Sequence, residues 1–189
     1  NIEVSKSQKR AKIKNSGINI NYLNVGGGFP VRYPDMRSFS LMDYFTAIRE
    51  SFSMVKKNKK IILMAEPGRC LVAECMSLVV KVELRKKNIL YINDGVHGSL
   101  HDAGNQGFIY PVKMINLRNK KIKKFNPFSF YGPTCDSSDF MEGPFCLPNC
   151  IDEGDFIEIG QLGAYSSVMR SNFNGFDYSN QKVVIGKKI

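Results

Sequence analysis

The sequence predicts an α/β segment followed by an all-β domain, and two patterns lead to this prediction. Within residues 18–69, an apolar strand, a glycine turn, an amphipathic helix, a second apolar strand and a second turn follow one another. Beyond them, short apolar strands alternate with Gly, Pro, Asn and Asp, which is typical of antiparallel sheets. A chain of 189 residues can bury one good core or two small ones. We therefore expect a domain boundary near residues 70–75.

The helix of the first segment is predicted from its hydrophobic spacing. Residues 38–57 carry apolar side chains at spacings of three and four, which defines one apolar face, and Ser38 is a suitable N-cap. The apolar residues are Leu41, Phe45, Ile48, Phe52 and Val55. A further helix is expected over residues 4–13, in a lysine-rich stretch.

Each of the two predicted strands of this segment ends in a turn suited to an anion. The strand over residues 18–25 runs into three glycines, and the strand over residues 61–65 runs into Glu66-Pro67-Gly68-Arg69. Glycine allows close approach of the backbone, and arginine offers a planar fork of donors. Parallel α/β folds bind ligands at the carboxyl ends of their strands. The pair of turns therefore indicates a binding site, although each turn by itself fits a purely structural role equally well.

Short strands are predicted throughout the second part of the chain. They cover residues 89–92, 108–115, 156–159 and 183–185, and Gly, Pro, Asn or Asp residues separate them. We expect them to form an antiparallel sheet.

Cys135 stands in a polar stretch, residues 132–139, that also carries aspartates. Thr134 or Ser137 is a candidate N-cap for a short helix there. A helix N-terminus lowers the pKa of a cysteine, whereas neighbouring carboxylates raise it. From the residues alone, Cys135 is a nucleophile, an acid, a redox thiol or a buried structural cysteine.

The composition argues against nucleic-acid and membrane partners. The net charge is +10, but the lysines fall into separate clusters with no interleaved aromatic residues, which favours solvated surface charge. No apolar run approaches the roughly 18 residues of a membrane span. The five cysteines lack C-x-x-C spacing, so we expect no metal site and reduced thiols in the cytoplasm.

Five motifs stand in an order that resembles a known family. They occupy residues 23–30, 66–69, 93–99, 132–136 and 163–176. The set is similar to the pyridoxal-phosphate-dependent ornithine/diaminopimelate/arginine decarboxylases of the alanine-racemase-like fold, and most similar to ornithine decarboxylase. The resemblance implies that residues 1–72 are the C-terminal part of the cofactor-binding, TIM-like β/α barrel, with its last strands and helices. Residues 73–189 would form the C-terminal antiparallel β domain.

The resemblance also implies roles for individual residues. Cys135 would be the acid that protonates the α-carbon after CO2 is lost. Asp136 would pair with the distal ammonium group of the substrate, and Phe173 would line the substrate pocket. The residues implied in binding pyridoxal 5'-phosphate are Gly28, Glu66, Pro67, Gly68, Arg69 and Tyr165. Glu66 would contact the pyridine nitrogen, because a carboxylate favours its protonated form.

The implied function is decarboxylation of ornithine to putrescine in polyamine biosynthesis, by a homodimer with its sites at the subunit interface. The Phe-Asn-Gly-Phe stretch at residues 173–176 favours ornithine over diaminopimelate enzymes. One alternative is a lysine or arginine decarboxylase. Another is a non-catalytic relative that binds a true decarboxylase or its regulators.

Three departures from the family pattern are visible. The lysine that holds the cofactor aldehyde belongs to an earlier barrel strand, and the chain begins without Met, so we expect a fragment or one half of a split protein with a separate N-terminal half. His97 stands where animal enzymes carry a tyrosine at the dimer interface. The second substrate-binding aspartate falls at Gln106, and Asp102 is the nearby carboxylate that would replace it.

Overall fold

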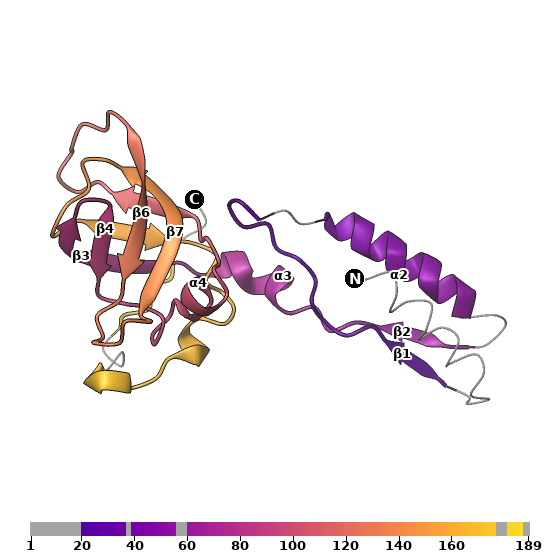
Figure 1. Cartoon of the computed structure of the whole chain (residues 1–189). Helices are drawn as coiled ribbons and strands as arrows, with labels where there is room; N and C mark the ends of the chain where they lie inside the picture. Colours follow the sequence, from indigo (N-terminus) through magenta and orange to yellow (C-terminus); the bar gives the residue numbers. More distant parts are fainter. Residues whose placement is uncertain (1–19, 37–38, 56–59, 177–180, 187–189) are drawn as a thin grey trace. The chain divides into compact units, whose positions relative to one another are not determined.

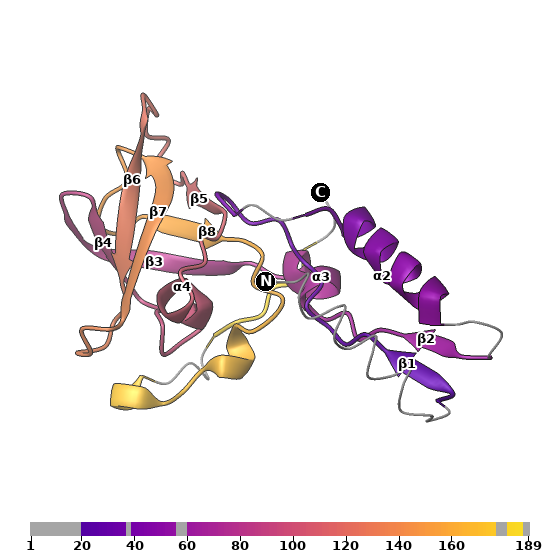
Figure 2. The ribbon, with the colours of Figure 1, turned by 45° about the vertical axis from the view of Figure 1, so that its right-hand side comes forward.

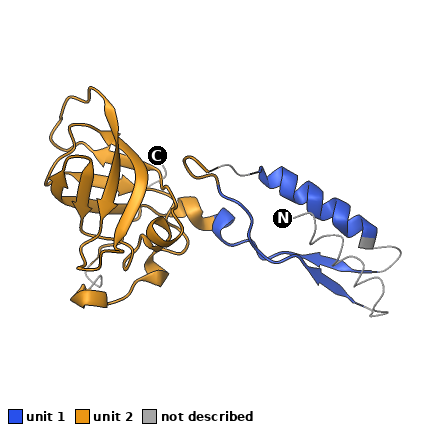
Figure 3. Cartoon of the chain, in the orientation of Figure 1, with its two compact units in different colours: residues 1–31, 37–71 blue, residues 32–36, 72–189 orange. Residues whose placement is uncertain are grey.

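The computed structural model describes residues 20–36, 39–55, 60–176 and 181–186. The chain divides into two compact units, one of residues 1–31 and 37–71 and one of residues 32–36 and 72–189 (Figure 3). The assignment of residues 1–72 to a barrel part and of residues 73–189 to a β domain stays a prediction. The helix expected over residues 4–13 lies outside the described residues.

The first unit contains a βαβ arrangement (Figure 1). Strand β1 (Tyr22–Asn24) and strand β2 (Ile62–Met64) pair in parallel, and helix α2 (Leu41–Val55) connects them. The short helix α3 (Arg69–Val72) follows the second turn. The predicted order of elements is confirmed, although both strands are shorter than predicted.

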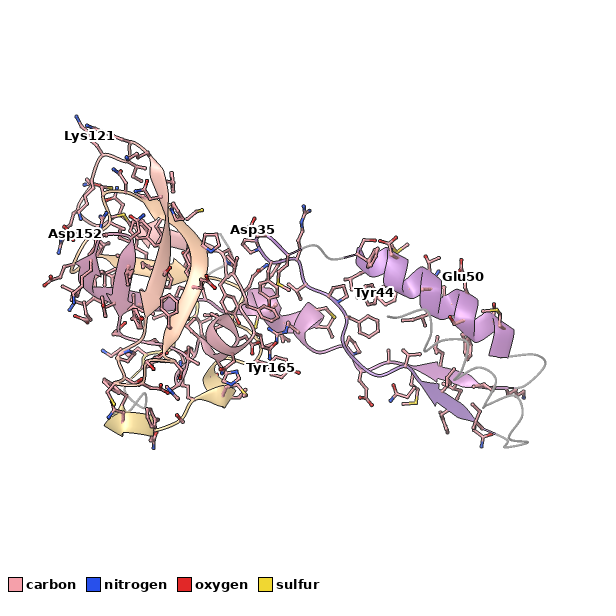
Figure 4. The ribbon with its side chains drawn as sticks, viewed as in Figure 1. Asp35, Tyr44, Glu50, Lys121, Asp152 and Tyr165 are labelled. Carbon is pink, nitrogen blue, oxygen red and sulfur yellow. The ribbon has the colours of Figure 1, made fainter. Side chains whose placement is uncertain are left out.

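Helix α2 begins with a capping box. The hydroxyl of Ser40 accepts the N–H of Asp43 at 3.2 Å, and the Asp43 carboxylate accepts the N–H of Ser40 at 2.9 Å. Ser38, the predicted N-cap, lies outside the described residues. The first turns of α2 place the rings of Tyr44 and Phe45 at 6.5 and 5.7 Å from the ring of Phe29, and Figure 4 labels Tyr44 on this helix.

The described part of the second unit contains a six-stranded sheet in the order β5-β8-β3-β4-β6-β7 (Figure 2). The bounds are Leu78–Lys86 for β3, Ile89–Ile92 for β4, Val112–Ile115 for β5, Phe125–Tyr131 for β6, Phe140–Pro148 for β7 and Phe156–Ile159 for β8. Helix α4 (His101–Asn105) and three short 3-10 turns, Ala73–Cys75, Ser167–Met169 and Phe173–Gly175, complete the unit.

The sheet is mixed, which corrects the expectation of a purely antiparallel one. Strands β4 and β6 pair in parallel, with Ile89 opposite Ser129 and Tyr91 opposite Tyr131, whereas every other pair is antiparallel. The chain between β4 and β6 includes α4 and β5, and a connection of that length allows parallel pairing. Sequence alternation alone does not reveal this pairing, because side chains alternate in both kinds of sheet.

Two further predictions about this unit are wrong. Residues 183–185 form no strand, and their side chains are 85–93% exposed, because an apolar triplet without a neighbouring strand has nothing to pair with. Cys135 lies in a bend and not at a helix N-terminus. The strands predicted over residues 89–92 and 156–159 are confirmed, and β5 covers only the second half of residues 108–115.

The core of the second unit comes from alternate residues of its strands, including the edge strand β7. Its fully buried members include Leu90, Ile92, Phe128, Phe130, Phe145, Leu147, Ile157 and Ile159. The rings of Phe130 and Phe145 stack at 4.2 Å across β6 and β7. Among the described residues, no helix is long and apolar enough to cross a bilayer.

The parallel pairing of β4 and β6 decides where the important loops lie. The carboxyl ends of parallel neighbours share one edge of a sheet. The loop after β4, residues 93–100, and the loop after β6, residues 132–139, therefore leave the sheet side by side. These loops carry His97 and Cys135, respectively.

Candidate active site

The two turns of the first unit are joined by backbone hydrogen bonds. The N–H of Val25 donates to the carbonyl of Met64 at 3.0 Å, and the N–H of Glu66 donates to the carbonyl of Gly26 at 2.9 Å. Close packing of the two backbones requires glycine at one position, since a Cβ on Gly27 would lie 2.8 Å from the Glu66 carbonyl oxygen. The turns predicted separately from the sequence thus form one structure.

The Glu66 side chain is fixed by Asn24, a residue that sequence reasoning did not select. The Nδ2 atom of Asn24 donates to Oε1 of Glu66 at 2.6 Å, while Oδ1 of Asn24 accepts the N–H of Gly26 at 2.8 Å. Asn24 therefore joins the carboxylate of the second turn to the backbone of the first. Its place at the end of a strand, two residues before the first of the glycines, was the signal that could have revealed it.

Open space adjoins the two glycines that were predicted to bind a phosphate. In the described part of the chain, no atom beyond the two adjacent residues lies within 4 Å of the Cβ that a side chain would add at Gly28 or Gly68. Gly28 has a φ of +81°, which favours glycine. Pro67 and Arg69 flank Gly68, and Arg69 begins α3. A carboxylate held in place, two accessible glycines and a nearby guanidinium suit the pyridine nitrogen and the phosphate of pyridoxal phosphate.

A second group of predicted residues gathers on the loops of the second unit. Asp136 lies beside His97, with Nε2 of His97 at 2.8 Å from Oδ2 of Asp136. The His97 ring lies 4.4 Å from the ring of Phe173, measured between centroids. The N–H of Cys135 donates to Oδ1 of Asn174 at 3.1 Å. Three segments that are distant in sequence thus place Cys135, Asp136 and Phe173 in one neighbourhood.

Asp136 is held in its ionised form. The side chain and the backbone N–H of Ser138 donate to its oxygens at 2.7 and 2.9 Å, and with His97 they lower the pKa of Asp136 to about 2. Because an ionised carboxylate only accepts hydrogen bonds, Nε2 of His97 carries the hydrogen of their contact. The result is a partly exposed negative charge one residue from the Cys135 thiol.

A chain of hydrogen bonds anchors the segment that carries Phe173. Nε of Arg170 donates to the Ser99 hydroxyl at 2.9 Å, and that hydroxyl donates to the buried carboxylate of Asp94 at 2.7 Å. The N–H of Ser171 donates to the carbonyl of His97 at 3.0 Å. Residues 170–174 are therefore tied to the 93–100 loop, which explains how Asn174 reaches Cys135.

Two other predicted residues, Tyr165 and Asp102, lie on other segments of the second unit. Tyr165 is 51% exposed, with a φ of +55°, on the segment between β8 and the turn Ser167–Met169 (Figure 4). Its role as a phosphate ligand stays a prediction. Asp102 lies in α4 with a side chain only 3% exposed, at 3.4 Å from Nδ1 of His101. This burial does not favour Asp102 as a substrate ligand, and that role also stays a prediction.

These features define the class of protein. The βαβ turns carry a glycine cradle beside a fixed carboxylate, and the mixed sheet carries a cysteine next to an ionised aspartate. A family model described as pyridoxal-dependent decarboxylase, C-terminal sheet domain, matches residues 11–163. The chain belongs to the family of pyridoxal-phosphate-dependent decarboxylases, and pyridoxal phosphate is the cofactor of this family.

Individual relatives agree with this assignment. The chain is 31% identical over 185 residues to a diaminopimelate decarboxylase of Helicobacter pylori, covering 90% of this chain and 42% of the relative. It is 30% identical over 166 residues to a lysine/ornithine decarboxylase of Selenomonas ruminantium, covering 85% of this chain and 40% of the relative. The crystal structure of a lysine/ornithine decarboxylase from Vibrio vulnificus, complexed with cadaverine, matches with a TM-score of 0.71 and 26% identity, over 93% of this chain and 46% of that one.

The comparisons support the family more broadly than the predicted substrate. Most of the curated relatives are diaminopimelate decarboxylases, from Helicobacter, Pseudomonas, Haemophilus and Vibrio species, and enzymes named for lysine and ornithine occur beside them. They do not single out ornithine. The chain spans about two fifths of the length of the curated relatives that it matches.

Proposed function

We propose that this chain forms part of a pyridoxal-phosphate-dependent decarboxylase that converts ornithine to putrescine. Residues 1–72 would be the C-terminal part of its β/α barrel, and residues 73–189 its C-terminal β domain. The observation that carries the substrate assignment is Asp136, an ionised carboxylate held by Ser138 and His97 beside Cys135. A substrate whose far end is a primary ammonium group matches this charge.

The first unit would hold the cofactor. When bound, pyridoxal phosphate supplies the electron sink that accepts the electron pair left by CO2 loss. Glu66, oriented by Asn24, would face the pyridine nitrogen and stabilise its protonated form. The N–H groups of Gly28 and Gly68, with the charge of Arg69, would hold the phosphate. The family resemblance implies that Tyr165, a residue of the second unit, would donate its hydroxyl to the same phosphate. Pro67 keeps the turn between Glu66 and Gly68 rigid.

The second unit would hold the substrate and supply the proton. Asp136 would pair with the distal ammonium, and Phe173 would line the pocket. The bond between the α-carbon and the carboxylate breaks to release CO2, and the proton on the Cys135 sulfur is transferred to the α-carbon. Ornithine and one proton thus give putrescine and CO2, and solvent returns the proton to Cys135.

The main alternative substrate is meso-diaminopimelate, because diaminopimelate decarboxylases predominate among the relatives. The far end of that substrate carries a carboxylate beside its ammonium group. A second carboxylate would meet the ionised Asp136 with like charge, which is unfavourable. Lysine and arginine end in a cation alone, so they remain closer competitors of ornithine. In each case we propose a homodimer with sites at the interface.

The test is a decarboxylation assay on the assembled enzyme that contains this chain. If the N-terminal half with the cofactor-binding lysine is a separate chain, it is added to the assay. Release of CO2 is measured with ornithine, lysine, arginine and meso-diaminopimelate. We expect the highest kcat/KM with ornithine. A preference for meso-diaminopimelate would refute the substrate assignment but keep the reaction class. No CO2 from any of the four, with cofactor bound, would favour the non-catalytic alternative.

A further inference from the structure

The carboxylate of Asp139 is completely buried between the two loops of the second unit. Its residue exposure is 0%. Oδ1 accepts the N–H of Val96 at 2.7 Å, and Oδ2 accepts the N–H of Thr134 at 3.1 Å and the Thr134 hydroxyl at 2.8 Å. One oxygen therefore accepts a hydrogen bond from the loop after β4, and the other accepts two hydrogen bonds from the loop after β6.

The glycines around Asp139 make the space that this carboxylate fills. A Cβ on Gly95 would lie 2.1 Å from Oδ1 of Asp139, and a Cβ on Gly132 would lie 2.2 Å from the same atom. Neither distance is possible for a real side chain. The sequence therefore carries glycine on both loops at the places where the carboxylate lies.

Each donor to Asp139 immediately precedes a residue of the candidate site. Val96 precedes His97, and Thr134 precedes Cys135. In addition, the N–H of Asp139 donates to the carbonyl of Asp136 at 3.0 Å. Asp139 thus fixes the backbone next to His97, which contacts Asp136, and next to Cys135, which carries the thiol.

We propose that Asp139 is a positioning residue, which locks the Cys135 loop to the His97 loop and thereby fixes the thiol for proton transfer. The catalytic half of this inference rests on the proposed function. A carboxylate can accept about four hydrogen bonds, and the described residues supply three donors from two loops, so one geometry satisfies all of them. Proton transfer depends on such fixed geometry, because a misplacement of about 1 Å can cost about a hundredfold in rate.

Three substitutions test the lock. Asp139→Asn keeps the size of the side chain but turns an amide N–H toward backbone donors. Thr134→Val removes one hydroxyl donor at constant shape, and Thr134→Ser is its conservative partner, which keeps that donor. Asp155→Asn is the matched control, because Asp155 is also a buried carboxylate, bonded to Lys120 at 2.6 Å, and belongs to no part of the site.

Backbone hydrogen exchange on the 189-residue chain gives a readout that does not depend on activity. With Asp139→Asn, the N–H groups of Val96 and Thr134 should exchange at least about tenfold faster, since they lose a charged acceptor. The core amides of β4 and β6 should change much less. Asp155→Asn should leave Val96 and Thr134 as in the wild type. Equal acceleration of all amides would mean general destabilisation and would refute the lock.

The kinetic readout uses the assembled enzyme loaded with cofactor. We expect Asp139→Asn to lower kcat about tenfold or more while KM for ornithine changes less than about threefold, because the thiol and not the cofactor cradle is displaced. Thr134→Val should lower kcat by a smaller factor, and Thr134→Ser should restore most of it. Asp155→Asn should keep the wild-type kcat.

The two proposals fail in different ways. If the wild type turns over ornithine and Asp139→Asn has an unchanged kcat, the positioning role is wrong and the function stands. If the wild type decarboxylates none of the four amino acids, the proposed function is wrong, and so is the claim that Asp139 positions the thiol for proton transfer. The exchange rates of Val96 and Thr134 then decide the lock alone.

Discussion

The two units differ in how much of their apolar surface they bury. Among the described residues of the first unit, only Phe29 and Ile61 are buried hydrophobics, and α2, β1 and β2 expose large apolar side chains. The exposed set includes Tyr22, Leu41, Met42, Phe45, Met54, Ile62 and Met64. The second unit buries a continuous core along its six strands. The first unit carries a cofactor-type cradle on a frame that, by itself, buries little apolar surface.

The candidate sites of the two units also differ in the groups that form and support them. In the first unit, two backbone turns carry the site together with the Glu66 carboxylate that Asn24 holds. A partner surface that covers the exposed apolar residues would add to the stability of this unit. In the second unit, side chains form the site, and the buried carboxylates Asp94 and Asp139 hold the loops that carry them. A site on side chains needs such internal supports, since a loop without them samples many geometries.

The largest expected difference between the units is in hydrogen exchange of the chain studied alone. Amides in β4 and β6 should exchange at least about a thousandfold more slowly than amides in β1 and β2, because few buried contacts oppose local opening of the first unit. Mass spectrometry or NMR measures both sets in one sample. Similar protection in the two units would contradict the inferred difference in their stability. Slower exchange in β1 and β2 after addition of a separate N-terminal half would show that a partner surface stabilises the first unit.

The second prediction compares one phenylalanine from each unit. Phe130→Ala should lower the free energy of unfolding of the second unit by about 3–5 kcal/mol, because Phe130 is completely buried and stacks on Phe145. Phe45→Ala should cost about 1 kcal/mol or less, since Phe45 is 40% exposed. Urea unfolding followed by circular dichroism measures both. An equal loss for the two variants would contradict the difference in burial.

The third prediction concerns the cradle of the first unit. Glu66→Gln should lower kcat of the assembled enzyme about a hundredfold, because the neutral amide no longer favours a protonated pyridine nitrogen. Binding of the cofactor phosphate should persist, since the glycine turns are unchanged. Asn24→Ala is the companion variant. It keeps the charge of Glu66 and removes only the hydrogen bond that orients this carboxylate, so kcat should fall by a smaller factor. An unchanged kcat in Glu66→Gln would refute the role of Glu66.

The smallest effect is expected at Asp136. Its pKa is lowered to about 2, first by the Ser138 hydroxyl, so Ser138→Ala should raise it part of the way toward the ordinary value of 3.8. The stabilising contribution of this carboxylate is fully present above pH 3.8 and is lost as the pH falls through about 2. In Ser138→Ala this contribution should be smaller, and its loss should be complete at a higher pH, because the folded-state pKa lies closer to 3.8. NMR titration of the side-chain carbon measures the pKa, and an unchanged value would contradict the assigned cause.

Much of the first unit could be predicted from the sequence because its signals are local. The spacing of Leu41 and Phe45 indicated the helix, and the glycines and the Glu66 turn indicated strand ends beside a ligand site. Ser40 as the actual cap was missed, since Ser38 and Ser40 look alike in sequence. Asn24 was missed because its two partners belong to different turns, and only pairing of β1 with β2 brings them together.

The second unit was predicted less completely because its contacts join distant segments. The residues Cys135, Asp136 and Phe173 were selected through the motifs that carry the family resemblance. Ser138, Asn174 and Asp139 were not selected, although the aspartate four residues after Cys135 was visible. Their importance depends on hydrogen bonds that arise only when the loops after β4 and β6 lie together.

By itself, the sequence determined the βαβ order, the two ligand-type turns, the positions of several strands and the family to which the chain belongs. These properties follow from residue spacing and from ordered motifs, which are properties of the linear chain. The tertiary structure alone decided that β4 and β6 run parallel, that Asn24 orients Glu66, and that one buried carboxylate holds two loops. Those outcomes depend on hydrogen bonds between residues far apart in the chain, and such bonds leave no periodic signal in the sequence.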